Sequence, residues 1–407
     1  MITTINNKHK KLNVPNLRFP EFQGEWKEER MADIADLYKG TGISKDQLSE
    51  EGEPCILYGE LYTKYKSETI EKVISKTNID NTKLVRSKAN DVIIPCSGET
   101  AEDIATARCV LNGNILLGGD LNIIRLHGYD GAFMSYQLNG RRKYDIAKVA
   151  QGVSVVHLYS EHLKGVKTIN PCLEEQKKIA SLLTLLDERI ATQNKIIEDL
   201  KMLKSAIIEN VFDDKHSERL QLDNVGSYIR GLTYSSNDVV EHGGTLVMRS
   251  NNIVNGSLLD YNNNVVFVNK QMSAEQQLQN GDIVICMANG SSALVGKSSF
   301  YDGKCTSPIT VGAFCGIYRS KMPITKWIFQ TNRYRRYIWN SLQGGNGAIA
   351  NLNGEDILRM QFPIPDEQKA ERCTKILSSL DSLIESNVSL CSKFSQQREY
   401  LLRQMFI

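Results

Sequence analysis

Two long stretches of the chain carry apolar residues whose spacings mostly alternate between three and four, the pattern of a helix with a narrow buried stripe. The first begins near Glu174, just past Pro171, and meets no proline or glycine before Gly226. Each stretch of about 37 residues, at about 1.5 Å per residue, gives a rod roughly 55 Å long, which exceeds one small globular core. The pattern therefore predicts two long helices packed along each other as an antiparallel coiled coil.

The predicted seam has equivalent members in both helices. They are Leu183, Leu186, Ile190, Gln193 and Ile197, continuing to Leu200, Leu203 and Ile207, and in the second helix Leu377, Leu380, Ile384, Asn387 and Cys391. Gln193 and Asn387 are polar at matching positions. Two interpretations stay open: buried polar residues that fix the register of the helices, or residues exposed at the helix edge.

A strand-rich region precedes each helix, at roughly 15–150 and 217–345. Short apolar runs bounded by Gly, Asn and Asp predict strands at 91–94, 122–126, 265–268 and 282–286. The expected fold class is α+β, with two similar mixed α/β domains, each followed by a long helix. We expect domain 1 at 1–160, a linker helix at 161–214, domain 2 at 215–354 and a second linker helix at 355–407, with a short polar connection at 213–217.

The two halves repeat each other. At a shift of 194 residues Leu183, Asp187 and Phe212 fall on Leu377, Asp381 and Phe406, and at a shift of 191 Asp91 falls on Asp282. A fixed shift over a whole half indicates duplicated architecture. Two copies of the repeat predict a molecule with pseudo-two-fold symmetry, so we expect a ligand bound by one half to be bound by both.

Composition excludes several classes of protein. No apolar run reaches the roughly 18 residues of a membrane span, and residues 1–11 lack the apolar core of a signal peptide. Nine scattered cysteines without a C-x-x-C pair predict reduced thiols in the cytoplasm rather than a metal site or disulfide framework. The net charge of +2 means that any nucleic-acid binding must come from local patches.

Catalytic motifs are missing from the sequence. We find no G-x-x-x-x-G-K-[ST] loop and no G-x-S-x-G elbow, and the glycine-rich stretch 344–347 follows a basic segment rather than preceding a phosphate-binding helix. Residues 170–173, Asn-Pro-Cys-Leu, lack the second proline and the aromatic of an N-P-P-[YF] motif. We expect no catalytic residue, no metal and no cofactor.

Basic tracts recur at the end of each strand-rich region, in segments expected to be helical. They comprise Arg141, Arg142 and Lys143 in the first half and Arg333, Arg335 and Arg336 in the second, interleaved with Tyr144, Tyr334 and Tyr337. Arginine forks and tyrosine hydroxyls suit phosphate oxygens. The alternative is a solvated helix face that duplication has copied.

Other segments have the same apolar positions in both halves but different polar residues between them. Residues 56–61 align with 247–252, and 96–99 align with 287–290. Arg and Asn suit bidentate contacts to guanine and adenine edges. The candidate base-reading residues are Tyr58, Glu60 and Ser97 in the first half and Arg249, Ser250, Asn251, Asn252 and Asn289 in the second. Ordinary loop drift on a shared scaffold is the alternative.

Over nearly its whole length the chain resembles the specificity subunits of type I restriction–modification systems. The resemblance is carried by Pro15–Pro20 followed by Glu25-Trp26, and by a Glu-Gln pair before each long helix, Glu175-Gln176 and Glu367-Gln368. The pairs are 192 residues apart while the helix bodies are 194 apart, which predicts a local two-residue slip in the second helix.

The resemblance implies a function for each part. The two domains would each read one half of a split, asymmetric site in double-stranded DNA. The paired helices would act as a ruler for the unread spacer and dock methyltransferase subunits, usually two, with ATP-dependent restriction subunits added separately. The rival interpretation is a coiled-coil interaction scaffold without DNA specificity.

Overall fold

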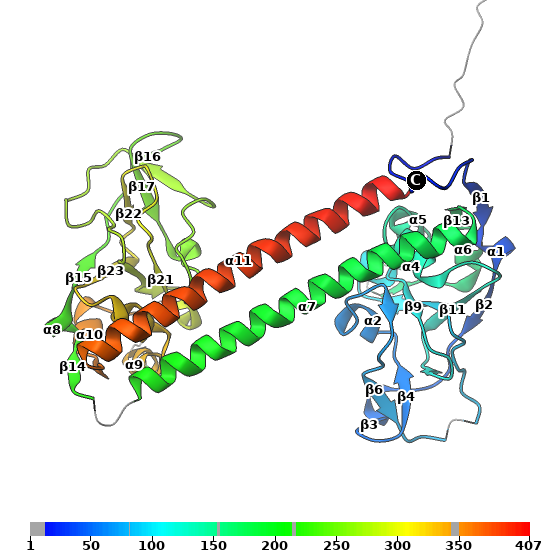
Figure 1. Ribbon diagram of the computed structural model, residues 1–407, viewed down its shortest axis with the longest axis horizontal. Helices are drawn as coiled ribbons and strands as arrows, with labels where there is room; N and C mark the ends of the chain where they lie inside the picture. The colour runs from blue at the N-terminus through cyan, green and yellow to red at the C-terminus, as the bar shows by residue number, and fades with distance from the viewer. Residues whose placement is uncertain (1–12, 81, 153–154, 214–216, 343–349) are drawn as a thin grey trace, which may run out of the picture. The chain divides into compact units, whose positions relative to one another are not determined.

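The computed structural model describes residues 13–80, 82–152, 155–213, 217–342 and 350–407. They form two compact units: a first unit of residues 1–194 with 390–407, and a second unit of residues 195–389 (Figure 1). Each unit contains one mixed α/β domain and parts of both long helices. The N-terminal residues 1–11, residues 153–154, residues 214–216 of the expected connection and the glycine-rich stretch 344–347 lie outside the described residues.

The domain of the first unit is built on a five-stranded sheet of order β2-β11-β7-β9-β5 and a four-stranded sheet of order β10-β4-β6-β3, with the strand pairs β1-β13 and β12-β8. The strands are β1 (Lys27–Arg30), β2 (Ala35–Lys39), β3 (Leu48–Ser49), β4 (Glu53–Ile56), β5 (Thr69–Ile70), β6 (Ser75–Thr77), β7 (Asp91–Pro95), β8 (Ser97–Gly98), β9 (Arg108–Val110), β10 (Leu116–Leu117), β11 (Leu121–Leu126), β12 (Val156–His157) and β13 (Lys167–Asn170). The helical segments are α1 (Met31–Ile34), η1 (Lys45–Gln47), α2 (Glu60–Thr63), α3 (Ala101–Ile104), α4 (Gly131–Asn139), α5 (Lys143–Val149) and α6 (Ser160–Lys164).

The domain of the second unit repeats this plan. Its sheets have orders β15-β23-β19-β21 and β16-β18-β17-β22, with the pairs β14-β25 and β20-β24. The strands are β14 (Arg219–Gln221), β15 (Gly226–Arg230), β16 (Val239–Val240), β17 (Thr245–Met248), β18 (Val266–Val268), β19 (Ile283–Cys286), β20 (Ala288–Asn289), β21 (Ser298–Phe300), β22 (Ile309–Val311), β23 (Cys315–Ser320), β24 (Ala350–Asn351) and β25 (Gln361–Pro363). The helical segments are α8 (Leu222–Val225), η2 (Ser236–Asp238), η3 (Ser250–Asn252), η4 (Ser292–Leu294), η5 (Pro323–Gln330), α9 (Asn332–Leu342) and α10 (Gly354–Leu358).

The strand orders match position by position, and the expected strands are confirmed. β11, β7 and β9 correspond to β23, β19 and β21, while β5 is an additional edge strand of the first domain. A buried ion pair recurs at the same point of both main sheets: Arg125 lies 2.7 Å from Asp91, and Arg319 lies 2.6 Å from Asp282. Duplication has therefore kept both the sheet framework and the charge pair that joins its inner strands, β7 to β11 and β19 to β23.

The long helices are α7 (Leu173–Phe212) and α11 (Glu367–Met405), as predicted. In the first unit Leu183 of α7 shares a hydrophobic core with Leu401 and Met405 of α11. In the second unit Ile208 of α7 shares a core with Leu377 of α11. The start of each helix thus packs against the end of the other, so the pair is antiparallel, and in Figure 1 the two helices run alongside each other.

The residues of the predicted seam differ in their burial. Leu183, Ile197 and Leu377 are buried, and Leu186, Ile190, Leu380, Ile384 and Cys391 are half-buried. Gln193 is buried, whereas its counterpart Asn387 is half-buried and donates to Leu383 O one turn back, at 2.7 Å. Leu203 is 50% exposed and Lys204 occupies the seam instead, because a carboxylate on α11 receives its ammonium group at 2.6 Å.

The expected two-residue slip of the second helix is wrong. The helices begin at residues 173 and 367, which keeps the shift of 194, so the two Glu-Gln pairs are not equivalent. Glu175 and Gln176 are buried in the third and fourth positions of α7, where Glu175 accepts two hydrogen bonds from Arg18 at 2.7 Å. Glu367 and Gln368 are the first two residues of α11 and are exposed.

The expected boundaries at 160 and 354 cut through the observed domains. β13 pairs with β1, and β25 pairs with β14, so residues assigned to the linkers complete the sheets of their own domains. The reason is that each helix enters directly from a strand of its domain, which leaves no free linker before α7 or α11.

Candidate nucleic-acid interface

A hollow of about 590 Å³ opens on the second domain where β17 ends, beside β20 and the turn between β22 and β23. Four of the five reading candidates of this half line it. They are Arg249, Ser250, Asn251 and Asn289. Two aromatic side chains, Tyr234 and Phe314, complete its wall, and Phe314 is 68% exposed.

The polar groups of this hollow are only partly satisfied by the protein. Arg249 donates from Nη2 to Asn264 O at 3.2 Å, while its Nε is buried and has no hydrogen-bond partner among the described residues. Asn289 donates from Nδ2 to Ser250 Oγ at 3.3 Å. A guanidinium fork, an amide and a hydroxyl beside an exposed ring provide the groups that read base edges in a DNA groove.

Asn252 requires a correction, because its side chain faces its own loop. It is 1% exposed, its Oδ1 accepts from Arg249 N at 2.9 Å, and its Nδ2 donates to Asp260 O and Asn263 O at 3.0 and 2.8 Å. Those bonds use the polar capacity of the amide. Asn252 therefore shapes the loop that carries Arg249 and does not face a ligand.

The first domain has a hollow of about 970 Å³ at the equivalent place, where β4 ends. β4 and η1 correspond to β17 and η2, and the loop before β11 corresponds to the loop before β23. The corresponding lining residues differ in kind: this hollow has Tyr58, Lys45, Glu99 and Asp120 where the other has Arg249, Ser236, Gly290 and Phe314. Two matched cavities with unlike linings suit two unlike ligand segments.

Glu60 and Ser97 of the first half also need revision. Glu60 lines the hollow but is only 5% exposed, and its carboxylate accepts from Leu57 N at 3.0 Å, from Lys64 Nζ at 2.6 Å and from Ser75 Oγ. It stabilises the turn into α2. Ser97 lies outside the hollow, on β8, 3.3 Å from His157 Nδ1. Of the three first-half candidates, Tyr58 therefore remains: it lines the hollow, and no hydrogen bond to another described residue is found for its hydroxyl group.

The two basic tracts do not occupy the same structure. Arg141 and Arg142 lie in the turn before α5, and Lys143 is the first residue of that helix. Arg141 donates to Arg403 O at 2.6 Å and Arg142 to Ile407 O at 3.4 Å, so both hold the last residues of the chain to the first domain. The expectation of a basic helix is therefore wrong for this pair.

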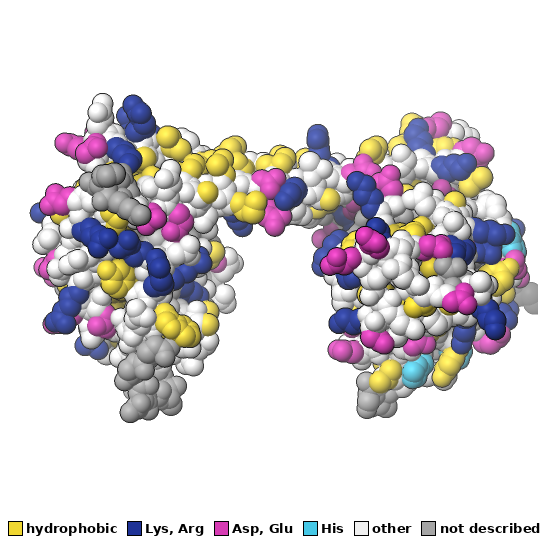
Figure 2. Space-filling view, turned by 90° about the horizontal axis from the view of Figure 1, so that it is seen from below, with side chains coloured by type: hydrophobic (Ala, Val, Ile, Leu, Met, Phe, Trp, Pro, Cys, Tyr) yellow, Lys and Arg dark blue, Asp and Glu magenta, His cyan; other side chains and the backbone are white. Residues whose placement is uncertain are grey.

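In the second domain the tract lies on α9, as expected. Arg335 and Arg336 are exposed, and Arg333 is half-buried with Nη2 3.9 Å from Asp213. Tyr334 is buried and donates to Gly296 O at 2.8 Å, so it cannot contribute a phosphate contact. Figure 2 shows Lys and Arg side chains gathered across this domain on the face displayed.

Sequence reasoning missed several residues that line the hollows, notably Asp120 and Phe314. The signal was present, since residues 118–121, Gly-Gly-Asp-Leu, align at a shift of 194 with residues 312–315, Gly-Ala-Phe-Cys. A Cβ at Gly118 would come within 3.1 Å of Ile56 O, a tight contact, whereas one at Gly312 would meet side chains at 3.4 Å. Tyr58 and Arg249 were found at positions where the two halves share their apolar residues but differ in the others. The same pattern applies to Asp120 and Phe314.

Two properties of the described residues concern metal binding and membrane insertion. Within the described ranges, no three His, Cys, Asp or Glu side chains gather in a way that could hold a metal ion. No helix among the same residues is long and apolar enough to cross a membrane.

Comparison with known proteins gives concordant matches. The family model of the type I restriction modification DNA specificity domain matches residues 23–202. The specificity subunit of the type I restriction enzyme EcoKI from Escherichia coli K12 is 32% identical over 170 residues, covering 39% of this chain and 35% of that protein. The StySPI specificity subunit from Salmonella potsdam gives the same identity and coverage, so the chain spans about a third of the length of these two relatives.

Longer matches extend over both halves. The MjaVIII specificity subunit of Methanocaldococcus jannaschii is 22% identical over 396 residues, covering 91% of this chain and 88% of the relative. The crystal structure of a type I restriction–modification S subunit from M. genitalium has a TM-score of 0.66 at 18% identity, covering 97% and 99% of the two chains. At that identity the structural likeness establishes the fold. The chain is therefore similar to the specificity subunits of type I restriction–modification systems, by sequence over 91% of its length and by fold over 97%, and its residues 23–202 match the DNA specificity domain of that family.

Proposed function

We propose that this chain is the DNA-reading subunit of a type I restriction–modification complex. Its first domain reads one half of a split, asymmetric duplex site, and its second domain reads the other half. The observation that carries the proposal is the pair of hollows, which occupy the same place in two equivalent domains but present different side chains. A symmetric site would require like linings.

The linings suit base edges of different kinds. In the second hollow, the Arg249 fork matches the acceptors of guanine and the Asn251 amide matches adenine, while Phe314 can contact a thymine methyl group. In the first, Glu99 and Asp120 can accept from the amino group of cytosine. Each well-formed bidentate contact contributes about 1–3 kcal/mol of discrimination between bases.

Phosphate contacts supply affinity in this proposal. The exposed Arg335 and Arg336 of α9 are the main candidates, with Arg333 beside them. Arg141, Arg142 and Lys143 contribute in the first half only as far as their bonds to the end of the chain permit. Because the net charge is only +2, binding depends on these local clusters.

The paired helices provide the surface for partner subunits. Large apolar side chains are exposed at points along both helices, where they are available to a partner subunit. They include Leu185, Met202 and Leu203 on α7 and Ile376, Leu383 and Val388 on α11. We assign this surface to methyltransferase subunits, two copies in keeping with the pseudo-symmetry, and to the ATP-dependent restriction subunits that join them. The chain itself carries no catalytic role in this proposal.

Selection from a pool of random DNA duplexes tests the proposal. The full chain should enrich a bipartite sequence with an unread spacer. Arg249→Ala and Asn251→Ala should relax base preference in one half-site and leave the other unchanged, because each hollow reads separately. Enrichment of no sequence, with no salt-sensitive binding to random duplex, would instead support a protein-interaction scaffold.

A further inference from the structure

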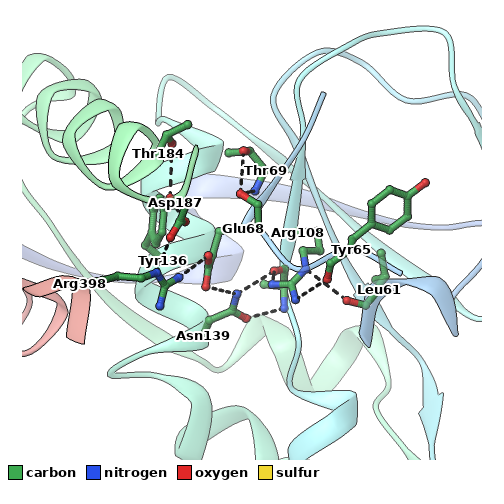
Figure 3. A network of polar contacts seen from close by, with 12 residues as sticks. Leu61, Tyr65, Glu68, Thr69, Arg108, Tyr136, Asn139, Thr184, Asp187 and Arg398 are labelled. Atoms are coloured by element: carbon green, nitrogen blue, oxygen red, sulfur yellow. Dashed lines mark hydrogen bonds and ion pairs between the residues drawn. The ribbon is translucent and has the colours of Figure 1, made fainter. Parts of the chain in front are cut away.

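One arginine near the end of α11 joins the helix pair to the first domain. Arg398 donates from Nε to Asp187 of α7 and from Nη2 to Glu68 of the domain, the latter at 2.6 Å (Figure 3). Asp187 also accepts from the hydroxyl of Tyr136 at 2.6 Å. Glu68 is 7% exposed and Asp187 is half-buried, so the group is largely removed from water. Burial alone would lower the pKa of Arg398, but the two carboxylates outweigh it and raise that pKa.

The contact continues from Glu68 into the domain. Asn139 donates to Glu68 Oε1 at 3.4 Å and to Ala107 O at 2.9 Å. The next residue, Arg108, is buried and donates to Leu61 O at 3.2 Å and to Tyr65 O at 3.1 Å. Burial lowers the pKa of Arg108, and the nearby Glu68 carboxylate favours its charged form. Figure 3 shows these side chains as one continuous polar network.

The network ends on the wall of the first hollow. Leu61 belongs to α2, and the residues on either side of it, Glu60 and Tyr62, line that hollow together with Tyr58. A buried charged donor on the carbonyl oxygens of Leu61, in α2, and Tyr65, just past its end, fixes the position of this wall. The helix pair and the reading surface of the first domain are thus joined by consecutive hydrogen bonds.

The second unit repeats only part of this arrangement. Asp381 and Lys204 take the places of Asp187 and Arg398, with Lys204 Nζ 2.6 Å from Asp381, and Trp327 Nε1 donates to Asp381 at 3.3 Å as Tyr136 does to Asp187. At the position of Glu68 the structure places Ser257, which carries no carboxylate: its main-chain oxygen accepts from Phe300 N as that of Glu68 accepts from Cys109 N. Lys204 donates to the main-chain oxygen of Gly256 instead, at 3.1 Å.

We propose that Glu68 and Arg398 are positioning residues for DNA reading: they hold the first recognition domain, through α2, at one fixed setting on the helix pair. The first half-site is then read at a single distance from the second. Neither residue contacts DNA in this proposal. The inference rests on the proposed function, since it assigns a role in reading a bipartite site.

The test is selection by the full chain from duplexes that carry two randomised blocks separated by spacers of graded length. The wild-type chain should enrich one spacer. Glu68→Gln keeps the shape of the side chain but removes its charge, so neighbouring spacers should gain about tenfold in relative enrichment, the change expected when one charged hydrogen bond is lost. Base preference in the second half-site should remain that of the wild type.

Matched variants separate positioning from general stability. Glu161→Gln removes an exposed carboxylate of the same domain, paired with Lys164 at 2.6 Å, and should leave the spacer preference unchanged. Arg398→Lys keeps the charge but replaces the Nε and Nη2 donors, which reach Asp187 and Glu68 separately, by a single ammonium group. It should therefore broaden the spacer preference as Glu68→Gln does, while Glu68→Asp should partly restore the narrow preference.

Each outcome decides the question. A spacer distribution for both Glu68→Gln and Arg398→Lys identical to that of the wild type overturns the inference. Equal loss of preference in both half-sites also overturns it, because positioning of one domain leaves the other able to read. If the wild-type chain enriches no bipartite sequence, the proposed function itself fails, which is a different result.

Discussion

Two neighbouring asparagines show how closely the proposed reading residues and the residues that shape their loops are interleaved in these domains. Asn251 is exposed at the edge of the second hollow, and Asn252 is buried beneath it. The buried amide joins three main-chain groups of the loop that carries Arg249. The exposed neighbour can change identity without disturbing the loop, so specificity can change on an unaltered scaffold.

Stability measurements on this pair test the division. Asn252→Ala should lower the free energy of unfolding by about 2 kcal/mol, because it leaves buried main-chain groups without partners. Asn251→Ala should change it by less than about 0.5 kcal/mol, as exposed substitutions usually do, yet alter which DNA is selected. Urea-induced unfolding measures the first effect. Equal stability of the two variants would contradict the assignment.

At this scale the sequence could locate the reading segments but could not separate their members. The mismatch between residues 56–61 and 247–252 points to both hollows. Glu60 and Asn252 nevertheless form hydrogen bonds within their own loops. The sequence cannot show this, because the same residue type can either cap its own turn or face a ligand. Arg141 and Arg142 were misjudged for a related reason, since their partners lie about 260 residues away along the chain.

Among the elements, the seam of α7 and α11 is defined by charge as well as by apolar side chains. The period of the sequence correctly predicts both helices, but it selects Leu203 where the structure buries Lys204. An apolar pattern cannot reveal that Asp381 receives this lysine across the seam, with Lys326 at 3.7 Å. The Lys326 side chain is only 19% exposed, and this burial lowers its pKa.

Removing the shared carboxylate should be costly. Asp381→Asn leaves Lys204 and Lys326 without their counter-charge in a largely buried site, and we expect a loss of about 3 kcal/mol in the free energy of unfolding. Asp199→Asn is the matched control, because its ion pair with Lys195 is exposed to solvent and contributes little to stability. Urea denaturation of both variants checks the contrast. Similar midpoints for the two would show that the buried pair carries no special weight.

The helix α9 should govern affinity without governing sequence. Replacing Arg335 and Arg336 by Ala should weaken binding to every duplex and reduce the slope of log K against log salt by about 1 to 2, as loss of one or two phosphate contacts requires. Arg359→Ala is the control, because Glu355 already neutralises that guanidinium at 2.5 Å. Titrations on random and selected DNA at several salt concentrations measure both. An unchanged slope would exclude phosphate contact by α9.

For the molecule as a whole, duplication explains which parts are shared and which differ. The sheets, the Asp91–Arg125 and Asp282–Arg319 pairs and the Asp187 and Asp381 positions repeat, so both halves fold and pack alike. The linings of the hollows and the Glu68 contact do not repeat. The fixed shift in the sequence was sufficient to predict the doubled fold. The contact between Glu68 and Arg398, which has no counterpart among the described residues of the second half, could not be predicted, because its residues are distant in the chain.

The continuous helices allow a test of their role as a ruler. Four residues inserted after Gln193 add about 6 Å to α7 at about 1.5 Å per residue, and a base pair rises about 3.4 Å along DNA, so the preferred spacer should lengthen by no more than about two base pairs. Four residues make slightly more than one turn, which keeps the apolar stripe facing α11. The same four residues placed between Gly243 and Gly244, in an exposed turn of the second domain, should leave the spacer unchanged. Selection from duplexes with graded spacers measures both, and an unaltered spacer after the helix insertion would remove the ruler role while leaving the two reading hollows intact.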